Sequence, residues 1–218
     1  MPLIWNGENI DCAADVLDWR ATKLEFNAAS PHCGVRKKPP QLGVIHFTGG
    51  ENPPPGIYKT LVQKQYAVEF AMDYYGHIYQ FCDPCKVFTA HAAGCNPWSF
   101  GIEIQSRGVP GTNAKQEADF PRGVYSENME WGAQKYVSFS KDQLNALVQL
   151  VDALAAINAV PARLAVKKVD IRKRVPKAQW PALTGWCGHY NVDLQDDTAK
   201  IDPGPQPLDE LWLHFNGK

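Results

Sequence analysis

The chain has 218 residues, which is enough for one domain with a full hydrophobic core and short for two. Apolar residues make up 44% of it and charged residues 21%, a composition that excludes a disordered chain. The formal net charge of -1 gives no electrostatic reason to expect nucleic acid or an anionic membrane as a partner. We therefore expect a globular monomer. The basic runs that begin at Arg36 and at Lys167 are interpreted as solvated faces.

No stretch of about 20 apolar residues predicts a transmembrane span. The first residues, Met1 to Asn9, have neither the basic segment nor the apolar segment of a signal peptide. These observations predict synthesis in a cytoplasm and no stable membrane association.

Residues 1–40 are interpreted as an N-terminal extension of unclear role, and residues 41–218 as the main domain. The apolar run Leu42–Phe47 predicts a buried strand that carries His46. The loop after it, Thr48–Gly56, holds too many prolines and glycines to predict a regular element. His46 therefore lies where a strand ends in a loop, a position from which a rigid element can aim a side chain at a substrate.

The alternating residues 66–81 predict a β-hairpin. A third strand, Ser99–Gln105, follows a loop that carries His91 and Asn96. This strand holds Glu103 between two isoleucines. Alternation alone leaves open whether the carboxylate faces solvent or a cleft.

Six cysteines, at positions 12, 33, 82, 85, 95 and 187, are too sparse for a disulfide scaffold in a chain of this length, so we expect most to be reduced. Cys82 and Cys85 have the spacing of half a zinc knuckle or of a redox pair, but no second CxxC completes a four-cysteine site. A structural or incidental role is preferred. The alternative is a structural metal held partly by these two thiols.

Residues 106–138 are rich in Gly, Pro, Asn and Glu without a sustained period, and we interpret them as a surface insertion. Ser140 and Gln143 form a capping box, and helically spaced leucines and valines continue to about Asn158, which predicts a helix. Residues 208–215 predict a second short helix or a turn. The expected fold is α/β, with a mixed central β-sheet flanked by helices.

Asp202 precedes a Pro-Gly-Pro turn, which leaves its backbone little freedom. With His46 and His189 it forms a set of two imidazoles and one carboxylate. Such a set supplies the three protein ligands of a catalytic zinc site and leaves the fourth position to water. Each residue alone is more simply explained as structural, but their joint occurrence with His91 and Glu103 favours a site.

In their order, these motifs resemble the zinc-dependent N-acetylmuramoyl-L-alanine amidases of the type 2 family, which share a fold with peptidoglycan recognition proteins. The resemblance covers about residues 42–205. Each motif alone is weak, but the ordered set is specific. The motifs are Val-Ile-His46 followed by Thr-Gly-Gly, Ala-His91-Ala-Ala-Gly, Cys-Asn96-Pro-Trp-Ser-Phe-Gly-Ile-Glu103, and Gly-His189 leading to Lys200-Ile-Asp202-Pro-Gly-Pro.

Two features depart from the family pattern: Glu69 stands where relatives usually carry His, and the gap between His189 and Asp202 is a few residues longer. Glu103 and the Lys-x-Asp ending resemble the cytosolic anhydromuropeptide-amidase branch more than the branch with Tyr and Cys there.

The resemblance implies a cleft with one catalytic Zn²⁺ at one end of the sheet. Zinc lowers the pKa of bound water to about 7 and polarises a carbonyl, which is what amide hydrolysis requires. The implied roles are zinc ligand for His46, His189 and Asp202, acid or base for Glu103, transition-state cation for Lys200, and substrate contact for His91 and Asn96.

The implied reaction is hydrolysis of the amide bond between N-acetylmuramic acid and L-alanine in peptidoglycan or a muropeptide. We expect an endolysin that is made in a host cytoplasm and acts on the cell wall after release. One alternative is a cytosolic muropeptide-recycling amidase. Another is a recognition module that binds peptidoglycan without cutting it, although relatives that only bind typically lack a zinc ligand.

Overall fold

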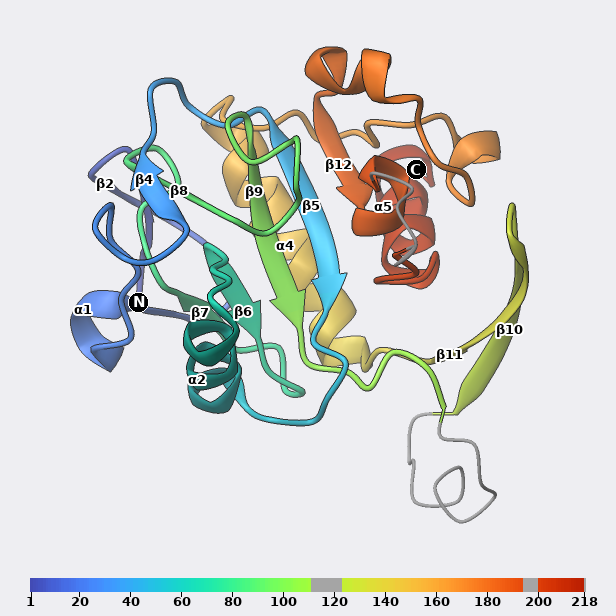
Figure 1. Ribbon diagram of the computed structural model, residues 1–218, viewed down its shortest axis with the longest axis horizontal. Coiled ribbons are helices and arrows are strands. Elements are labelled where there is room, and N and C mark those ends of the chain that lie inside the picture. Colours follow the sequence, from blue (N-terminus) through green and yellow to red (C-terminus); the bar gives the residue numbers. More distant parts are fainter. Residues whose placement is uncertain (111–122, 194–199, 218) are drawn as a thin grey trace.

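The computed structural model describes residues 1–110, 123–193 and 200–217. A six-stranded sheet lies at its centre in the order β12-β5-β9-β6-β7-β3 (Figure 1). Neighbouring strands are parallel except β6 and β7, which form the predicted antiparallel hairpin. The predicted α/β fold with a mixed central sheet is therefore confirmed. The strands are β3 (Val16–Asp18), β5 (Leu42–Phe47), β6 (Phe70–Met72), β7 (Ile78–Gln80), β9 (Ser99–Ile104) and β12 (Gly185–Gly188).

Three antiparallel pairs lie outside this sheet: β1 (Leu3–Trp5) with β2 (Glu8–Ile10), β4 (Cys33–Val35) with β8 (Val87–Thr89), and β10 (Val124–Met129) with β11 (Gly132–Val137). The described α-helices are α1 (Trp19–Thr22), α2 (Pro54–Lys64), α4 (Lys141–Ala156) and α5 (Gln206–Asn216). Short 3₁₀ helices are η1 (Lys168–Asp170), η2 (Lys177–Ala182) and η3 (His189–Val192). None of the helices in the described ranges is long and apolar enough to cross a membrane.

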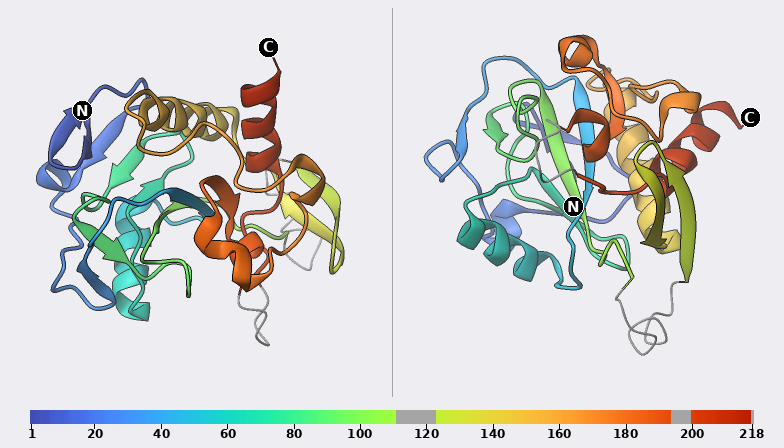
Figure 2. Two further views of the ribbon diagram at one scale, coloured as in Figure 1. Left: turned by 90° about the horizontal axis from the view of Figure 1, so that it is seen from above. Right: turned by 45° about the vertical axis from the view of Figure 1, so that its right-hand side comes forward.

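Helices α4 and α2 cover opposite faces of the sheet (Figure 2). Helix α4 begins as predicted: Ser140 Oγ accepts the Gln143 N–H at 3.0 Å, and the Gln143 side chain accepts the Ser140 N–H at 3.0 Å. Its apolar side packs in the largest core cluster. That cluster includes Leu147, Leu150, Val151 and Leu154 of α4 and Ile45, Phe70, Ile102 and Ile104 of the strands.

Strand register decides which way Glu103 points. In the parallel ladders Glu103 lies directly opposite His46 on β5 and Ala71 on β6. Successive side chains of a strand point to opposite faces. Because Ile102 and Ile104 pack in the α4 core, His46 and Glu103 face the other side of the sheet, where α2 lies.

Helix α2 corrects the prediction of a loop up to Gly56. The helix begins at Pro54, with two prolines in its first turn, and buries Ile57 and Leu61 against the sheet. Proline is tolerated there because the first N–H groups of a helix have no intrahelical partner and its φ already suits a helix. The run of three prolines is thus a helix start rather than a break.

The predicted surface insertion contains a regular element. Residues 124–137 form the β10–β11 hairpin, while residues 111–122 lie outside the described part of the chain. Met129 and Tyr136 of this hairpin are buried in the main core cluster. Polar residues stand at consecutive positions in both strands, at 126–128 and at 134–135, so the period of two that marks a strand is weak in the sequence.

Residues 1–40, interpreted as an extension, pack on the same core as the rest. Strand β3 forms one edge of the central sheet, and Leu3, Trp5 and Val16 join the main cluster. The buried Gln80 side chain accepts the N–H of Ile4 at 2.9 Å and donates to its carbonyl at 2.6 Å. The sheet therefore uses the N-terminal segment as one of its strands.

Arg36, predicted on a solvated face, is instead half of a buried ion pair. Its Nη2 lies 2.9 Å from Oε1 of Glu69, and both side chains are 0% exposed. Every donor nitrogen of the guanidinium is bonded, and the second Glu69 oxygen is bonded as well. The remaining partners are the carbonyls of Val87, Asn96, Pro97 and Ser99 for Arg36, and Thr89 Oγ1 and the Gly101 N–H for Glu69.

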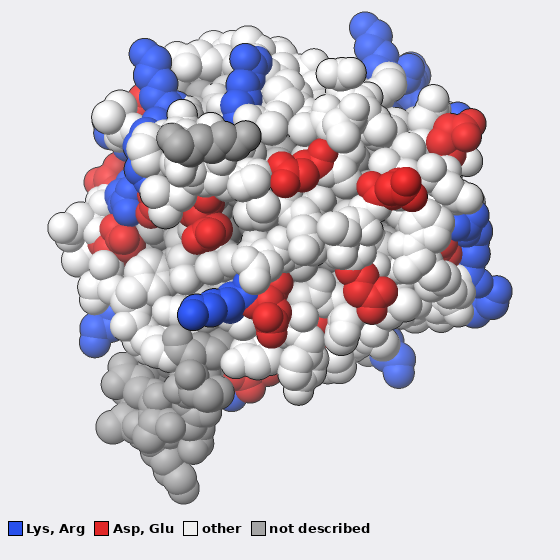
Figure 3. All heavy atoms as spheres, turned by 180° about the vertical axis from the view of Figure 1, so that it is seen from behind, with Lys and Arg blue, Asp and Glu red and all other residues white. Residues whose placement is uncertain are grey.

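On the face shown in Figure 3, acidic and basic side chains are interspersed, without a broad patch of one sign. The surface ion pair of Lys173 with Asp170, at 3.0 Å, is about half exposed. Its loss should therefore cost less free energy of unfolding than the loss of the Arg36–Glu69 pair.

Replacing Arg36 by Met should lower the free energy of unfolding by about 3–5 kcal/mol, because it leaves the Glu69 carboxylate buried without its counter-charge. Lys173→Met is the matched control and should cost less than about 1 kcal/mol, since its ion pair is solvent-screened. Chemical denaturation of both variants measures the difference. An Arg36→Met protein as stable as the control would contradict the inferred importance of the pair.

Candidate active site

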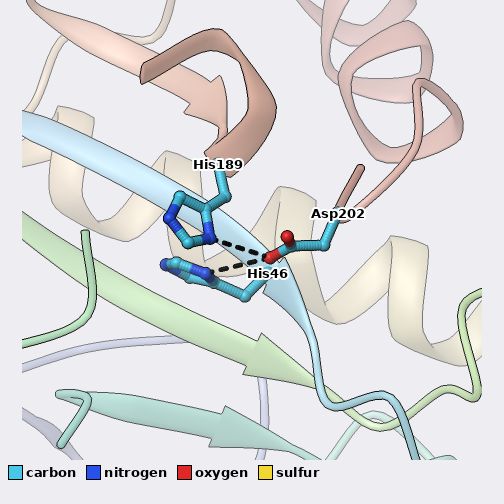
Figure 4. Close-up of side chains that lie close together, drawn as sticks. All are labelled: His46, His189 and Asp202. Atoms are coloured by element: carbon cyan, nitrogen blue, oxygen red, sulfur yellow. Dashed lines mark hydrogen bonds and ion pairs between the residues drawn. The ribbon is translucent and has the colours of Figure 1, made fainter. Parts of the chain in front are cut away.

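Three side chains from separate elements meet at one end of the sheet (Figure 4). His46 comes from β5, His189 begins η3 directly after β12, and Asp202 lies in the loop before α5. The Nδ1 atoms of His46 and His189 each lie 3.1 Å from Oδ2 of Asp202. The His46 and His189 rings meet at an angle of 63° with centroids 4.4 Å apart.

This cluster has the donor set of a metal site. One ligand atom of each residue lies within 4.8 Å of the others, and the three residues are at most 9% exposed. Two imidazole nitrogens and one carboxylate oxygen suit zinc. Within the described ranges, no other group of three histidines, cysteines or carboxylates is close enough to hold an ion. The residues present therefore fit a single metal ion.

The electrostatics of the cluster match this use. Burial alone would raise the pKa of Asp202, but the imidazoles of His189 and His46 hold it well below its usual range. Burial, reinforced by His189, lowers the pKa of His46 to about 4. At neutral pH the carboxylate is thus ionised and the His46 ring is neutral, which are the protonation states that metal ligands need.

The longer gap between His189 and Asp202 does not separate them. The Tyr190 N–H donates to the Asp202 carbonyl at 3.0 Å, so the backbones of the two ligand segments are joined. The Lys200 N–H donates to Oδ2 of Asp193 at 2.9 Å, which holds together the two ends of the segment 194–199 that lies outside the described residues.

The β10–β11 hairpin supports both of these segments. At Gly204, whose φ is +79°, a Cβ would come within 2.8 Å of the Tyr136 ring, so the ring packs directly on the backbone. Trp131 meets the Tyr190 ring edge-on, with centroids 5.7 Å apart. Gly204 and Tyr190 each lie within two residues of a candidate ligand. The hairpin therefore contributes packing to the site.

The cluster opens into a cavity of about 430 Å³. All seven site residues predicted from sequence line it: His46, His91, Asn96, Glu103, His189, Lys200 and Asp202. Sequence reasoning missed other residues of the lining, among them His32, Leu61 and Tyr66. Leu61 belongs to α2 and Tyr66 follows it. The signal was the helical spacing of Ile57 and Leu61, masked by the prolines before them.

Glu103 lies in the cavity wall beside His46. Among the residues that the structure describes, none hydrogen-bonds its buried Oε2. Burial, together with the negative charge of Asp202, raises the pKa of Glu103 well above its usual value, although Lys200 and Lys64 oppose the shift. A carboxyl group with a raised pKa can both take up a proton and give it back, as an acid–base catalyst has to do.

His91 and Asn96 lie in the loop before β9, and both His91 ring nitrogens and Oδ1 of Asn96 contact the protein. Oδ1 of Asn96 accepts the backbone N–H groups of His91 and Ala92, at 3.1 and 2.7 Å. The two ring nitrogens of His91 each lie 3.1 Å from a protein atom, in His46 and in Ser99. Their predicted contact with substrate stays a prediction.

The Cys82–Cys85 segment is a turn. Oδ1 of Asp83 accepts the Cys85 N–H at 2.9 Å, and both thiols are buried. Burial raises the pKa of Cys82 well above its usual value and that of Cys85 to about 11, so neither is a thiolate at neutral pH. No third metal-binding side chain joins them in the described part of the chain, which removes the support for a structural metal there.

The comparison with curated proteins gives no match. Among solved structures, the chain is similar to the N-acetylmuramoyl-L-alanine amidase LysC from Clostridium intestinale URNW, at 16% identity and a TM-score of 0.53, over 93% of this chain and 97% of that one. The Ph2119 endolysin from Thermus scotoductus MAT2119 bacteriophage Ph2119 aligns at 14% identity and a TM-score of 0.50, over 89% and 97%.

Drosophila peptidoglycan recognition protein SD aligns at 14% identity and a TM-score of 0.51, over 88% of this chain and 89% of that one. Identities this low show the fold alone. The family described as N-acetylmuramoyl-L-alanine amidase matches residues 36–205, which is most of the chain. With the shared fold and a two-histidine, one-aspartate cluster in the cavity, this match places the chain in the N-acetylmuramoyl-L-alanine amidase family.

Proposed function

We propose that this protein is a zinc-dependent hydrolase of the amide bond between N-acetylmuramic acid and L-alanine of peptidoglycan, and that it acts as a cell-wall-lysing endolysin after release from a host cytoplasm. The observation that carries the proposal is that the His46, His189 and Asp202 cluster shares one cavity with Glu103, whose Oε2 atom is buried. Family membership supports the same reaction and substrate.

His46, His189 and Asp202 would hold the ion. Zinc bound there would supply a water nucleophile at neutral pH and a Lewis acid for the scissile carbonyl. The cavity of about 430 Å³ is in the size range of small-molecule sites, so it can enclose the muramoyl-alanine junction of a longer substrate.

Glu103 moves the proton. Its Oε2 would accept a proton from the attacking water as the carboxylate and donate it to the departing alanine amine as the acid, a role worth about 10²–10⁴-fold in rate. Lys200 lines the same cavity, and its ammonium would stabilise the negative charge that develops on the carbonyl oxygen.

A cytosolic recycling amidase is the second candidate, because Glu103 and the Lys200-x-Asp202 ending resemble that branch. The two candidates differ in substrate. An endolysin releases material from intact, cross-linked cell wall, whereas a recycling enzyme prefers soluble anhydromuropeptides. The rates of one preparation on these two substrates therefore distinguish the two candidate functions.

Purified protein should carry one zinc ion per chain and should release peptides with a free L-alanine amino group from cell wall, without new reducing sugar ends. A zinc site of this kind attacks acyl carbons, whereas cleavage of sugar links needs a different pair of carboxylates. Metal analysis and mass spectrometry of the digest provide the measurement. New reducing ends without free alanine amines would refute the amidase proposal.

The same preparation tests the ligands. His46→Ala, His189→Ala and Asp202→Ala should each lose stoichiometric zinc and activity, because one of three protein ligands is removed. Cys82→Ser is the control and should keep both. Full zinc content in any ligand variant would remove that residue from the site.

Glu103→Gln should keep zinc content and melting temperature close to wild type while kcat falls by about 10²–10⁴-fold. The amide has the shape of the neutral acid that burial favours at this position, so the fold is preserved and only proton transfer is lost. A Glu103→Gln protein that melts early but turns over normally would show that another residue transfers the proton.

Lys200→Met should likewise lower mainly kcat, since the charge that Lys200 stabilises develops only in the transition state.

A further inference from the structure

A line of hydrogen bonds runs from the backbone to the candidate metal site. The Ser99 hydroxyl donates to the Cys95 carbonyl at 2.9 Å. Ser99 Oγ lies 3.1 Å from Nε2 of His91, and Nδ1 of His91 lies 3.1 Å from Nε2 of His46. The other nitrogen of the His46 ring faces Asp202 at 3.1 Å. These four consecutive contacts depend on where the hydrogens of the Ser99 hydroxyl and of the two imidazole rings lie.

The positions of those protons follow from the first contact. The Ser99 hydroxyl has one hydrogen, and a carbonyl only accepts, so that hydrogen points to Cys95. Ser99 Oγ must then accept from the Nε2–H of His91. A neutral imidazole has one donor and one acceptor, so Nδ1 of His91 accepts, and His46 donates through its Nε2–H. The lone pair of His46 is left on Nδ1, which faces Asp202.

The same contacts require a neutral His91 ring. If Nδ1 of His46 is the ligand atom, the single hydrogen of that ring lies on Nε2, which faces Nδ1 of His91 at 3.1 Å. Nδ1 of His91 then has to accept this hydrogen bond, and a protonated ring, whose two nitrogens both donate, cannot accept it.

The His91 ring packs closely against the backbone of β9. A Cβ at Gly101 would lie 2.8 Å from its Cγ and Nδ1, so the ring packs on the bare backbone of β9. Oδ1 of Asn96 accepts the backbone N–H of His91 at 3.1 Å, and Nη1 of Arg36 donates to the carbonyl of Asn96 at 3.2 Å. Both the ring and the loop that carries it are fixed.

We propose that His91 is a positioning residue for the metal site: together with Ser99 it fixes the tautomer and ring orientation of His46, so that the Nδ1 lone pair points to the ion. The inference rests on the proposed zinc site and assigns His91 a role other than substrate contact, because both of its ring nitrogens are engaged with protein. Groups that orient a metal-bound histidine typically contribute about 10–100-fold to metal affinity.

Two substitutions of His91 separate this role from simple packing. Phe fills the space of the ring but cannot accept a hydrogen bond, whereas Asn is smaller and keeps an acceptor oxygen near the position of Nδ1. A positioning role predicts that His91→Phe loses about 10–100-fold in zinc affinity and that His91→Asn retains more of it. A packing role predicts the reverse order.

Zinc affinity is measured by competition with a chromogenic chelator, alongside KM at saturating zinc. Ser99→Ala, which leaves the imidazole in place, should also weaken zinc binding, to a smaller extent. His32→Asn is the control: its ring lines the same cavity and contacts Gln65 at 3.4 Å rather than a ligand, so zinc affinity should not change. Thermal melts of each variant establish that it is folded.

Unchanged zinc affinity in folded His91→Phe, or a larger loss in His91→Asn than in His91→Phe, would overturn the inference. A raised KM with unchanged zinc affinity would restore the substrate-contact role. Failure of the proposed function has a different signature, because it would appear as a wild-type protein that binds no zinc or leaves the muramoyl-alanine bond intact.

Discussion

The buried Arg36–Glu69 ion pair constrains the part of the fold on which the site is built. A guanidinium removed from water has to satisfy all of its donors, and here the carbonyls that do so come from the β8 strand, the loop before β9 and the first residue of β9. The loop that carries His91 can therefore adopt few conformations. Because Arg36 belongs to the N-terminal segment and Glu69 precedes β6, this requirement also ties that segment to the central sheet.

The predictable parts of the structure are those with local signals. A continuous apolar run identified the His46 strand, and a capping box with helical spacing identified the helix after Ser140. The candidate ligands were found by residue type and order, and the structure brings them together. Helix α2 was missed because prolines are usually breakers, and the β10–β11 hairpin because polar residues occupy both of its faces. The Arg36–Glu69 contact joins positions 33 residues apart, and no local pattern reports such a pairing.

The carboxyl groups of Asp202 and Glu103 line the same cavity, but their surroundings shift their pKa values in opposite directions. Asp202 lies between two imidazoles, which hold its pKa low and keep it ionised. The Oε2 atom of Glu103 is buried and receives no hydrogen bond from the described residues. Desolvation and the negative charge of Asp202 raise the pKa of Glu103. Paired carboxyls with opposite shifts are typical of sites where one binds or stabilises charge and the other transfers a proton. Alternation in the sequence could not supply this distinction, because it depends on β9 lying between β5 and β6.

Each candidate ligand is held in place by contacts with residues that are not ligands. His46 is aimed by β5 and contacted by His91, while His189 is followed by Tyr190, which packs on the hairpin. Asp202 is joined to Tyr190 through its backbone carbonyl. A metal site requires its donors to be fixed to within a fraction of an ångström, and residues on loops reach that precision only when neighbouring contacts hold them. The hairpin and the N-terminal segment have no motif of their own, but their contacts hold the residues that carry the motifs. Without those contacts, two imidazoles and a carboxylate would be three unrelated side chains rather than a set of metal ligands.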